Sequence, residues 1–131
     1  IAAGLQLSPA EQELIFVAAP MHDIGKVGTR DDVLSKSGHL SSDELTEIRK
    51  HAGIGHDILR DSTSPLLQAA AVIAVSHHGR FDGSGYPHGL AGEEIPLHGR
   101  IVALADVFDA LTGAEDGPTA IRMQTAVVAE D

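Results

Sequence analysis

Apolar residues recur at the spacing of an amphipathic helix in several stretches of the chain, and turn residues separate these stretches. The first begins at Ser8, where Ser-Pro-Ala-Glu forms a capping box with proline at the first helical position. Its apolar positions are Leu14, Val17, Ala18 and Met21. We expect this helix to run into His22-Asp23, because Gly25 and Gly28 then break it.

A second helix begins at Ser41, which forms another capping box with Glu44. The segment before it, 29–38, is largely polar and is predicted to be a loop. The apolar positions of the second helix are Leu45, Ile48 and Ala52. We expect the glycines at 53 and 55 to end this helix or to begin a short new turn.

Ser64-Pro65 is a third helix start, and the run from 66 to 75 behind it is apolar almost all round. Such a helix is typically buried. The segment 79–99 holds six of the fourteen glycines and two prolines, so it is predicted to be a loop. Helical spacing returns over 97–111, at Ile101, Leu104, Ala105 and Phe108, and a weaker helix is expected over 119–129. The sequence therefore predicts an all-α fold with one long glycine-rich loop.

The composition is that of one globular domain. The chain has 131 residues, of which 43% are hydrophobic and 21% are charged, and these values argue against disorder. No apolar run approaches the about 20 residues of a membrane span, and the N-terminal residues lack the basic region of a signal peptide. The absence of cysteine excludes disulfides and thiolate metal sites and fits a cytoplasmic protein.

The charge balance restricts the partners. Nine basic and nineteen acidic residues give a net charge of −10 with the eight histidines neutral. Such a chain is poorly suited to follow DNA along its backbone, because phosphate contacts rely on lysine and arginine. An anionic substrate would need another positive partner, and the many histidines and carboxylates suggest metal ions.

Histidine and aspartate occur at the ends and inner edges of the predicted helices. The candidate metal ligands are His22, Asp23, His51, His77, His78 and Asp106. A buried aspartate is costly unless it is paired or bound to a metal. Neutral imidazoles and carboxylates suit iron, manganese, zinc and nickel. Six ligands are more than one ion usually draws from a protein, so two ions bridged by a carboxylate fit better.

Each of these residues also has an ordinary explanation. A histidine pair at a helix C-terminus can simply be favoured by the helix dipole. Asp106 could pair with Arg100, and Asp109 is expected to have a supporting role. The residues predicted to lie on the surface or in loops are His39, His56, His88 and His98. The conjunction of the six candidates, and no single one of them, favours a metal centre.

Five separated motifs resemble those of HD-GYP domains. They are His-Asp-Ile-Gly-Lys at 22–26, His51 with Gly55, His-His followed by Arg-Phe-Asp-Gly-Ser-Gly-Tyr-Pro at 77–87, the segment 89–96, and the segment 100–112 ending in Asp-Ala-Leu-Thr. The resemblance covers residues 5 to 112 and implies an HD-domain helical bundle. It also implies a bacterial phosphodiesterase that hydrolyses cyclic di-GMP to linear pGpG or GMP. Two or three divalent ions would serve it, iron or manganese first, with zinc, nickel or magnesium as alternatives.

The resemblance assigns a role to each matching residue. The six candidates become metal ligands, with Asp23 as the bridging and catalytic carboxylate. Lys26 becomes the catalytic lysine that faces the substrate phosphate, and Tyr86 forms part of the wall that binds the substrate. The partners that the resemblance implies are a receiver or sensor domain and, through the Gly-Tyr-Pro loop, a diguanylate cyclase-type domain.

The chain departs from the family pattern in three places. Gly79 stands where members carry a glutamate, the first helix with its further histidine is expected to be missing before Ile1, and 113–118 lack an Arg-Pro-Tyr-Lys stretch. Residues 1–131 are therefore expected to be one HD-GYP-like domain with a poorly matching tail at 113–131. Two alternatives stay open: a non-catalytic module that binds cyclic dinucleotides or proteins, and another HD-type nucleotide phosphohydrolase.

Overall fold

The computed structural model describes residues 1–112, and this part of the chain contains helices and loops but no strand. The α-helices are α1 (Pro9–Ala18), α2 (Asp31–Leu34), α3 (Ser42–Arg49), α4 (His51–Leu59), α5 (Pro65–Ser76) and α6 (Leu97–Thr112). The 3-10 helices are η1 (Ala19–Met21), η2 (Ile24–Gly28) and η3 (Gly92–Glu94). The helix expected over 119–129 and the tail from 113 lie outside the described residues. The all-α prediction is confirmed for residues 1–112.

Both predicted capping boxes are present. The Ser8 hydroxyl accepts a hydrogen bond from the Glu11 backbone N–H, and the Glu11 carboxylate accepts one from the Ser8 backbone N–H. The same reciprocal pair joins Ser41 and Glu44 at the start of α3. These bonds satisfy N–H groups that a helix start leaves without an internal partner, so the two helices begin where the sequence predicts.

Several stretches differ from the prediction. The first α-helix ends at Ala18, and the 3-10 helix η1 leads from it to His22. The single helix expected to run from Ser41 to Ala52 is divided into α3 and α4 at Lys50.

Helix α2 lies within the segment 29–38, which was expected to be a loop. Val33 is buried, so this single helical turn packs against the rest of the protein. Helix α4 runs through Gly53 and Gly55. A Cβ at Gly55 would lie 3.1 Å from the Cβ of Ala74 in α5. This glycine therefore permits close packing of the two helices and does not break α4.

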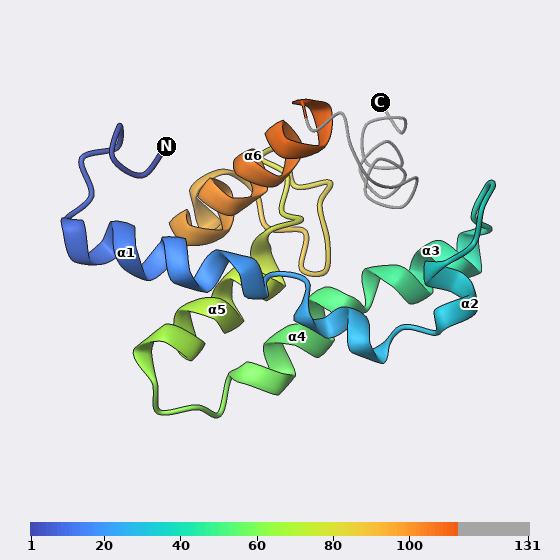
Figure 1. The fold of residues 1–131 in the computed structure, drawn as a ribbon. Helices are drawn as coiled ribbons and strands as arrows, with labels where there is room; N and C mark the ends of the chain where they lie inside the picture. Colours follow the sequence, from blue (N-terminus) through green and yellow to red (C-terminus); the bar gives the residue numbers. More distant parts are fainter. Residues whose placement is uncertain (113–131) are drawn as a thin grey trace.

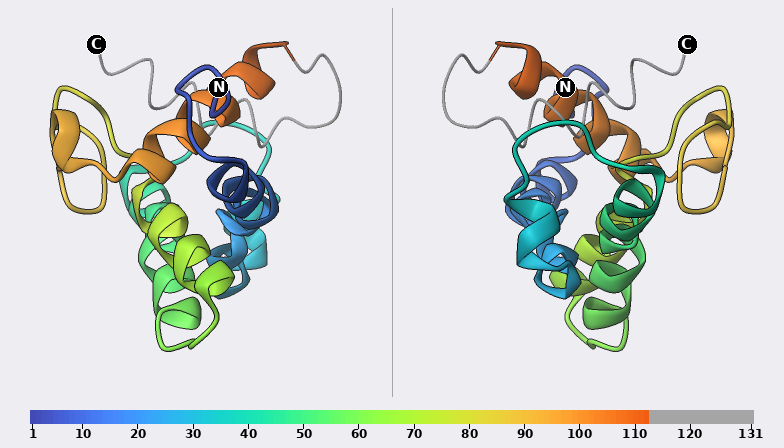
Figure 2. Two further views of the ribbon diagram at one scale, coloured as in Figure 1. Left: turned by 90° about the vertical axis from the view of Figure 1, so that its left-hand side faces the viewer. Right: turned by 90° about the vertical axis from the view of Figure 1, so that its right-hand side faces the viewer.

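Helix α5 lies at the centre of the arrangement. It packs against α4 on one side and against α1 and α6 on the other, as Figures 1 and 2 show. Its sequence explains the position, since small alanines let neighbouring helices approach on every side. The buried residues of α5 are Ala69, Ala70, Ala71, Ile73, Ala74 and Ser76. The prediction of a buried helix over 66–75 is confirmed.

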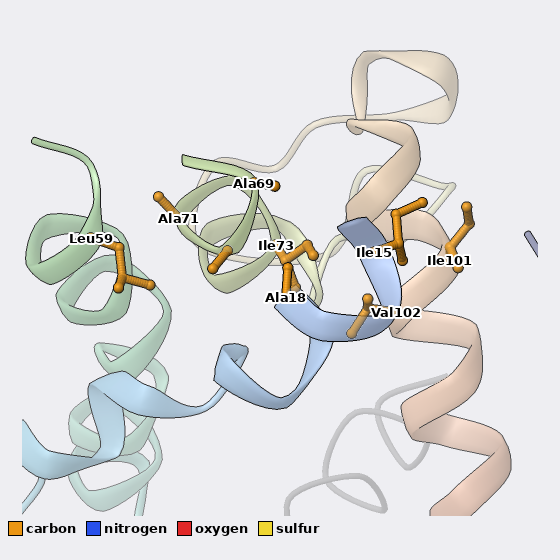
Figure 3. Packing of buried hydrophobic residues seen from close by; sticks show 9 residues of the cluster. Ile15, Ala18, Leu59, Ala69, Ala71, Ile73, Ile101 and Val102 are labelled. Atoms are coloured by element: carbon orange, nitrogen blue, oxygen red, sulfur yellow. The ribbon is translucent and has the colours of Figure 1, made fainter. Parts of the chain in front are cut away.

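The main hydrophobic core lies where α1, α5 and α6 meet (Figure 3). Ile15 and Ala18 of α1 enter it beside Ile73 of α5, which is completely buried. Ile101 and Val102 contribute from the first turns of α6. Burying apolar surface of this kind supplies about 25 cal/mol per Å², which makes the core the main force that holds the three helices together.

The apolar spacing of α6 is only partly buried within residues 1–112. Leu104 and Phe108 are 58% and 66% exposed, whereas Ile101 is 7% exposed. Only the first turns of α6 lie close to α5, where a Cβ on Gly99 would collide with the Ser76 side chain. No helix among the described residues has the length and hydropathy needed to cross a membrane.

The glycine-rich loop returns to the end of α5 before α6 begins. The Tyr86 backbone N–H donates to the carbonyl oxygen of His78 at 3.2 Å, and a Cβ on Gly85 would lie 2.4 Å from that oxygen. The Asp82 carboxylate accepts from the backbone N–H and the hydroxyl of Ser84, which closes a tight turn. The loop is therefore ordered, and it places the Tyr86 ring next to the histidine pair.

Replacing Gly25 of η2 and Gly53 of α4 by alanine should change the free energy of unfolding in opposite directions. A Cβ on Gly25 would lie 1.9 Å from the carbonyl oxygen of His51, and no rotamer relieves a clash with backbone. We expect Gly25→Ala to lower the free energy of unfolding by about 2 kcal/mol or more. A Cβ on Gly53 meets nothing within 4 Å, so Gly53→Ala should raise it by about 0.5–1 kcal/mol. Urea denaturation curves measure both, and equal effects would contradict the packing described for Gly25.

Candidate metal centre

The six candidate ligands come from four separate parts of the chain. His22 and Asp23 lie between η1 and η2, His51 begins α4, and the histidine pair follows α5 directly. The last candidate, Asp106, comes from the middle of α6. Figure 1 shows that the end of α1, the start of α4 and the end of α5 converge. The fold therefore brings together residues that are up to 84 positions apart in the sequence, from 22 to 106.

The Asp23 carboxylate lies between two groups of histidines. Its Oδ1 is 3.3 Å from Nε2 of His51 and 3.7 Å from Nε2 of His77. Its Oδ2 is 3.4 Å from Nε2 of His22, and that nitrogen is also 3.6 Å from Oδ1 of Asp106. Suitable ligand atoms of Asp23, His51, His77 and His78 all lie within 4.8 Å of one another.

Hydrogen bonds fix the orientation of three imidazoles. Nδ1 of His22 lies 2.8 Å from the carbonyl oxygen of Ala19, Nδ1 of His51 lies 2.6 Å from that of Ile48, and Nδ1 of His77 lies 2.9 Å from that of Ala74. A carbonyl oxygen only accepts, so each Nδ1 carries the proton. In the neutral ring, Nε2 then presents its lone pair to the cluster, which is the usual arrangement of a metal-binding histidine.

The contacts between these nitrogens suit a cation placed among them. Nε2 of His51 lies 3.4 Å from Nε2 of His77, although the Nδ1 bonds leave a lone pair on both atoms. His51 is completely buried and His77 is 3% exposed, so water cannot screen their repulsion. A divalent cation that accepts both lone pairs would remove it. The donor set, imidazole nitrogens with carboxylate oxygens, fits such an ion.

The charge states at the cluster agree with this fit. Burial raises the pKa of Asp23. Its contacts with His22, His51 and His77, and with the Lys26 ammonium, lower this pKa by more than burial raises it, so the pKa lies well below its usual range. Burial, followed by the charges of the neighbouring imidazoles, lowers the pKa of His78 to about 2. At neutral pH the cluster therefore offers an ionised carboxylate and a neutral His78, the protonation states that bind metals. Burial lowers the pKa of His22, but its contact with Asp23 raises this pKa by more, so a metal at His22 competes with a proton.

Lys26 and Tyr86, the two further residues of the predicted site, both lie at the cluster. The Lys26 ammonium donates to Oδ2 of Asp23, the oxygen that faces His22. The Tyr86 ring stacks on the His78 ring, with the centroids 4.6 Å apart and the planes inclined by 22°. Arg49 was not among the predicted site residues, although its guanidinium carbon lies 5.3 Å from the centroid of the Tyr86 ring. Its position two residues before His51 along the chain was the one available signal.

The histidines predicted to lie on the surface or in loops are not part of the cluster. His39 and His88 are exposed, and Nδ1 of His56 lies 3.5 Å from Oδ1 of the neighbouring Asp57. Asp109 lies with His22 and Asp106 along an open, mainly apolar groove of about 820 Å³ between α1 and α6. This groove was not predicted, because it depends on how α1 and α6 lie relative to each other in the fold.

Comparisons with known proteins agree with this geometry. A family model described as an HD domain matches residues 1–129. The chain is 48% identical over 127 residues to the cyclic di-GMP phosphodiesterase response regulator RpfG of Xanthomonas campestris, covering 97% of this chain and 34% of the relative. It is 50% identical over 111 residues to a cyclic di-GMP phosphodiesterase of Thermotoga maritima, covering 85% and 30%. It is 48% identical over 105 residues to 3'3'-cGAMP-specific phosphodiesterase 2 of Vibrio cholerae, covering 80% and 20%.

The chain spans about a third or less of the length of these three relatives. The family match nevertheless extends over almost all of its residues, and the described part has the helical fold and the His-Asp cluster that the match leads one to expect. The chain belongs to the HD domain family, and its similarity to these relatives is that expected of an HD-GYP domain.

Proposed function

We propose that this domain holds two divalent cations bridged by Asp23 and hydrolyses a phosphodiester bond of a cyclic dinucleotide. The observation that carries the proposal is that the two oxygens of the Asp23 carboxylate face different histidines. Its Oδ1 faces His51 and His77, whereas its Oδ2 faces His22. Two oxygens that face separate ligand groups suit a carboxylate shared by two ions.

The ligands divide accordingly. One ion would be held by the buried group, His51, His77 and His78, together with Oδ1 of Asp23. The other would be held by His22 and Asp106 together with Oδ2 of Asp23. We propose iron or manganese, since mixed imidazole and carboxylate ligands without thiolate suit these metals, although zinc, nickel and magnesium also use such groups.

When bound, the cations would neutralise charge on the substrate phosphate and lower the pKa of a water molecule. The protein residues supply the rest. Asp23 stays ionised, and the Nδ1 hydrogen bonds keep three imidazoles in the tautomer that binds metal. Lys26 carries an ammonium at the edge of the cluster, where it can bind a non-bridging phosphate oxygen as charge develops in the transition state. Tyr86 forms part of the wall beside the substrate.

The names of the relatives support the substrate class. Two of them are named cyclic di-GMP phosphodiesterases, and the Vibrio cholerae relative is named 3'3'-cGAMP-specific. We propose cyclic di-GMP as the substrate, with linear pGpG or GMP as the product. The 48% sequence identity to the cGAMP-specific relative makes 3'3'-cGAMP a second candidate substrate. A direct comparison of the hydrolysis rates of the two dinucleotides separates these candidates.

The same relatives support a proposal for the setting of the domain. One is named a response regulator, which supports a role as the output domain of a bacterial signalling protein with a receiver or sensor domain as partner. We place this activity in the cytoplasm, where such regulators act on a diffusible dinucleotide. A contact between the Gly-Tyr-Pro loop and a diguanylate cyclase-type domain is part of the same proposal.

Removing the bridging carboxylate should remove metal from both positions. We expect Asp23→Ala to lower the bound metal from about two ions per chain to less than one, because the remaining imidazoles hold one ion weakly. Elemental analysis of the purified protein measures the content. Asp61→Ala is a matched control, since the side chain of that aspartate is 91% exposed and lies beside Arg60, away from the cluster. An unchanged metal content in Asp23→Ala would refute the bridging role.

The histidines should separate into two classes. We expect His77→Ala and His78→Ala each to weaken metal binding about 10- to 100-fold, because both offer ligand atoms to the cluster. The exposed His39 and His88 should tolerate alanine without change. Titration with Mn²⁺ in the presence of a competing chelator measures all four variants. Equal losses in the two classes would show that the ligand assignment is wrong.

The function itself is tested by turnover. We expect Mn²⁺- or Fe²⁺-loaded protein to hydrolyse cyclic di-GMP faster than 3'3'-cGAMP, and to lose all activity in EDTA. Lys26→Met should keep its metal and lose about 100-fold in kcat/KM, since it removes charge from the transition state but no ligand. Chromatography of the nucleotide products gives both rates. Metal-loaded protein that binds either dinucleotide without cleaving it would instead support the non-catalytic module.

A further inference from the structure

His78 is oriented differently from the other histidines of the cluster. His22, His51 and His77 each place Nδ1 at a backbone carbonyl oxygen. Within residues 1–112, the Nδ1 of His78 makes no hydrogen bond that could fix its ring in the same way. Its Nε2 nevertheless points to the cluster and lies 3.1 Å from Nε2 of His51. Some other contact must hold this ring.

Two aromatic rings provide contacts of this kind. The His77 ring lies 3.9 Å from the His78 ring between centroids but is inclined by 45°, whereas the Tyr86 ring is stacked on His78. The Tyr86 ring lies nearly parallel to the His78 ring, with a separation of 4.6 Å between centroids, and it approaches the His51 ring edge-on at 6.4 Å. A flat stack restricts the rotation of an imidazole about its Cβ–Cγ bond, because turning the ring would drive its edge into the partner ring. The stack therefore does for His78 what a hydrogen bond does for the other three.

Tyr86 is itself held on two sides. Its backbone N–H donates to the carbonyl oxygen of His78, so the stacked residues are also joined through the backbone. The Arg49 guanidinium, from the last turn of α3, lies over the Tyr86 ring at 5.3 Å from its centroid. A cation over a tyrosine ring contributes about 0.5–1 kcal/mol at exposed sites and more when water is excluded. Arg49 thus links α3 to the loop and keeps the ring against His78.

We propose that Tyr86 is a positioning residue for His78, and that Arg49 supports it from α3. This inference rests on the proposed metal centre, and it gives Tyr86 a role beyond forming the wall of the substrate site. The aromatic ring, not the hydroxyl, carries the role. The chemistry thus predicts that phenylalanine can replace tyrosine here, whereas an aliphatic side chain cannot.

The test compares metal affinity in five forms of the chain by Co²⁺ titration against a competing chelator. We expect Tyr86→Leu to weaken the affinity about tenfold, the lower end of losses seen when groups that orient metal ligands are removed. Tyr86→Phe should stay within about twofold of the wild type. Arg49→Met, which keeps the aliphatic stem but removes the charge, should lose about threefold. Phe81→Leu is the matched control, since Phe81 is an aromatic residue of the same loop that is 71% exposed.

The Co²⁺ absorption bands provide a second readout, because they respond to how the imidazoles surround the ion. We expect Tyr86→Leu to shift these bands and Tyr86→Phe to match the wild type. Thermal unfolding of the metal-free forms shows whether each variant is folded. If Tyr86→Leu does not fold, the Arg49→Met result decides, with a loss of affinity supporting the proposal and an unchanged affinity refuting it.

Two failures are distinguishable. A wild-type chain that binds no Co²⁺ would refute the proposed metal centre. A wild-type chain that binds Co²⁺, with a folded Tyr86→Leu of equal affinity and spectrum, would refute only the positioning role. An equal loss in Phe81→Leu would also refute it, since the effect would then belong to the loop as a whole.

Discussion

The site depends on the close contact between the 3-10 turn η2 and the first turn of α4. The backbone at Gly25 lies against the carbonyl group of His51, at a distance that leaves no room for a Cβ. This contact fixes the residue two positions earlier, Asp23, beside the His51 ring. Any side chain at position 25 would push the turn away from α4. The geometry of the proposed metal centre therefore depends on the absence of a side chain at Gly25.

Small side chains are also important along α5. Alanines on several faces of this helix allow α1, α4 and α6 to approach it at once, so its C-terminal end emerges at the point where their ends meet. His77 follows directly and is almost completely buried. A helix with larger residues would hold its neighbours farther away and separate the imidazoles. Packing density in the core thus decides whether the ligands can share an ion.

How much of this was predictable from the sequence differs from element to element. The starts of α1 and α3 were predicted, because a capping box is a local hydrogen-bond pattern that two residues, three positions apart, are enough to form. The candidate ligands were predicted from the order of their motifs, and the structure brings Asp23, His51, His77 and His78 together. The course of α4 through Gly55 was not predictable, since a glycine that breaks a helix and one that permits packing look alike without the partner helix. Arg49 was missed for the same reason, as its contact with Tyr86 joins segments 37 positions apart, from 49 to 86.

The two ways of orienting imidazoles follow from where each histidine lies. His22, His51 and His77 each lie within reach of a carbonyl oxygen in the preceding helical turn, so a hydrogen bond of the helix end can hold the ring. His78 is the second residue after α5, where the chain has already left the helical path and turns into the loop. The loop must then provide the constraint, and it does so with an aromatic face at Tyr86. A metal centre whose ligands come from consecutive residues needs both devices, because one helix end can orient one ring of the pair while the other ring depends on what folds back over it.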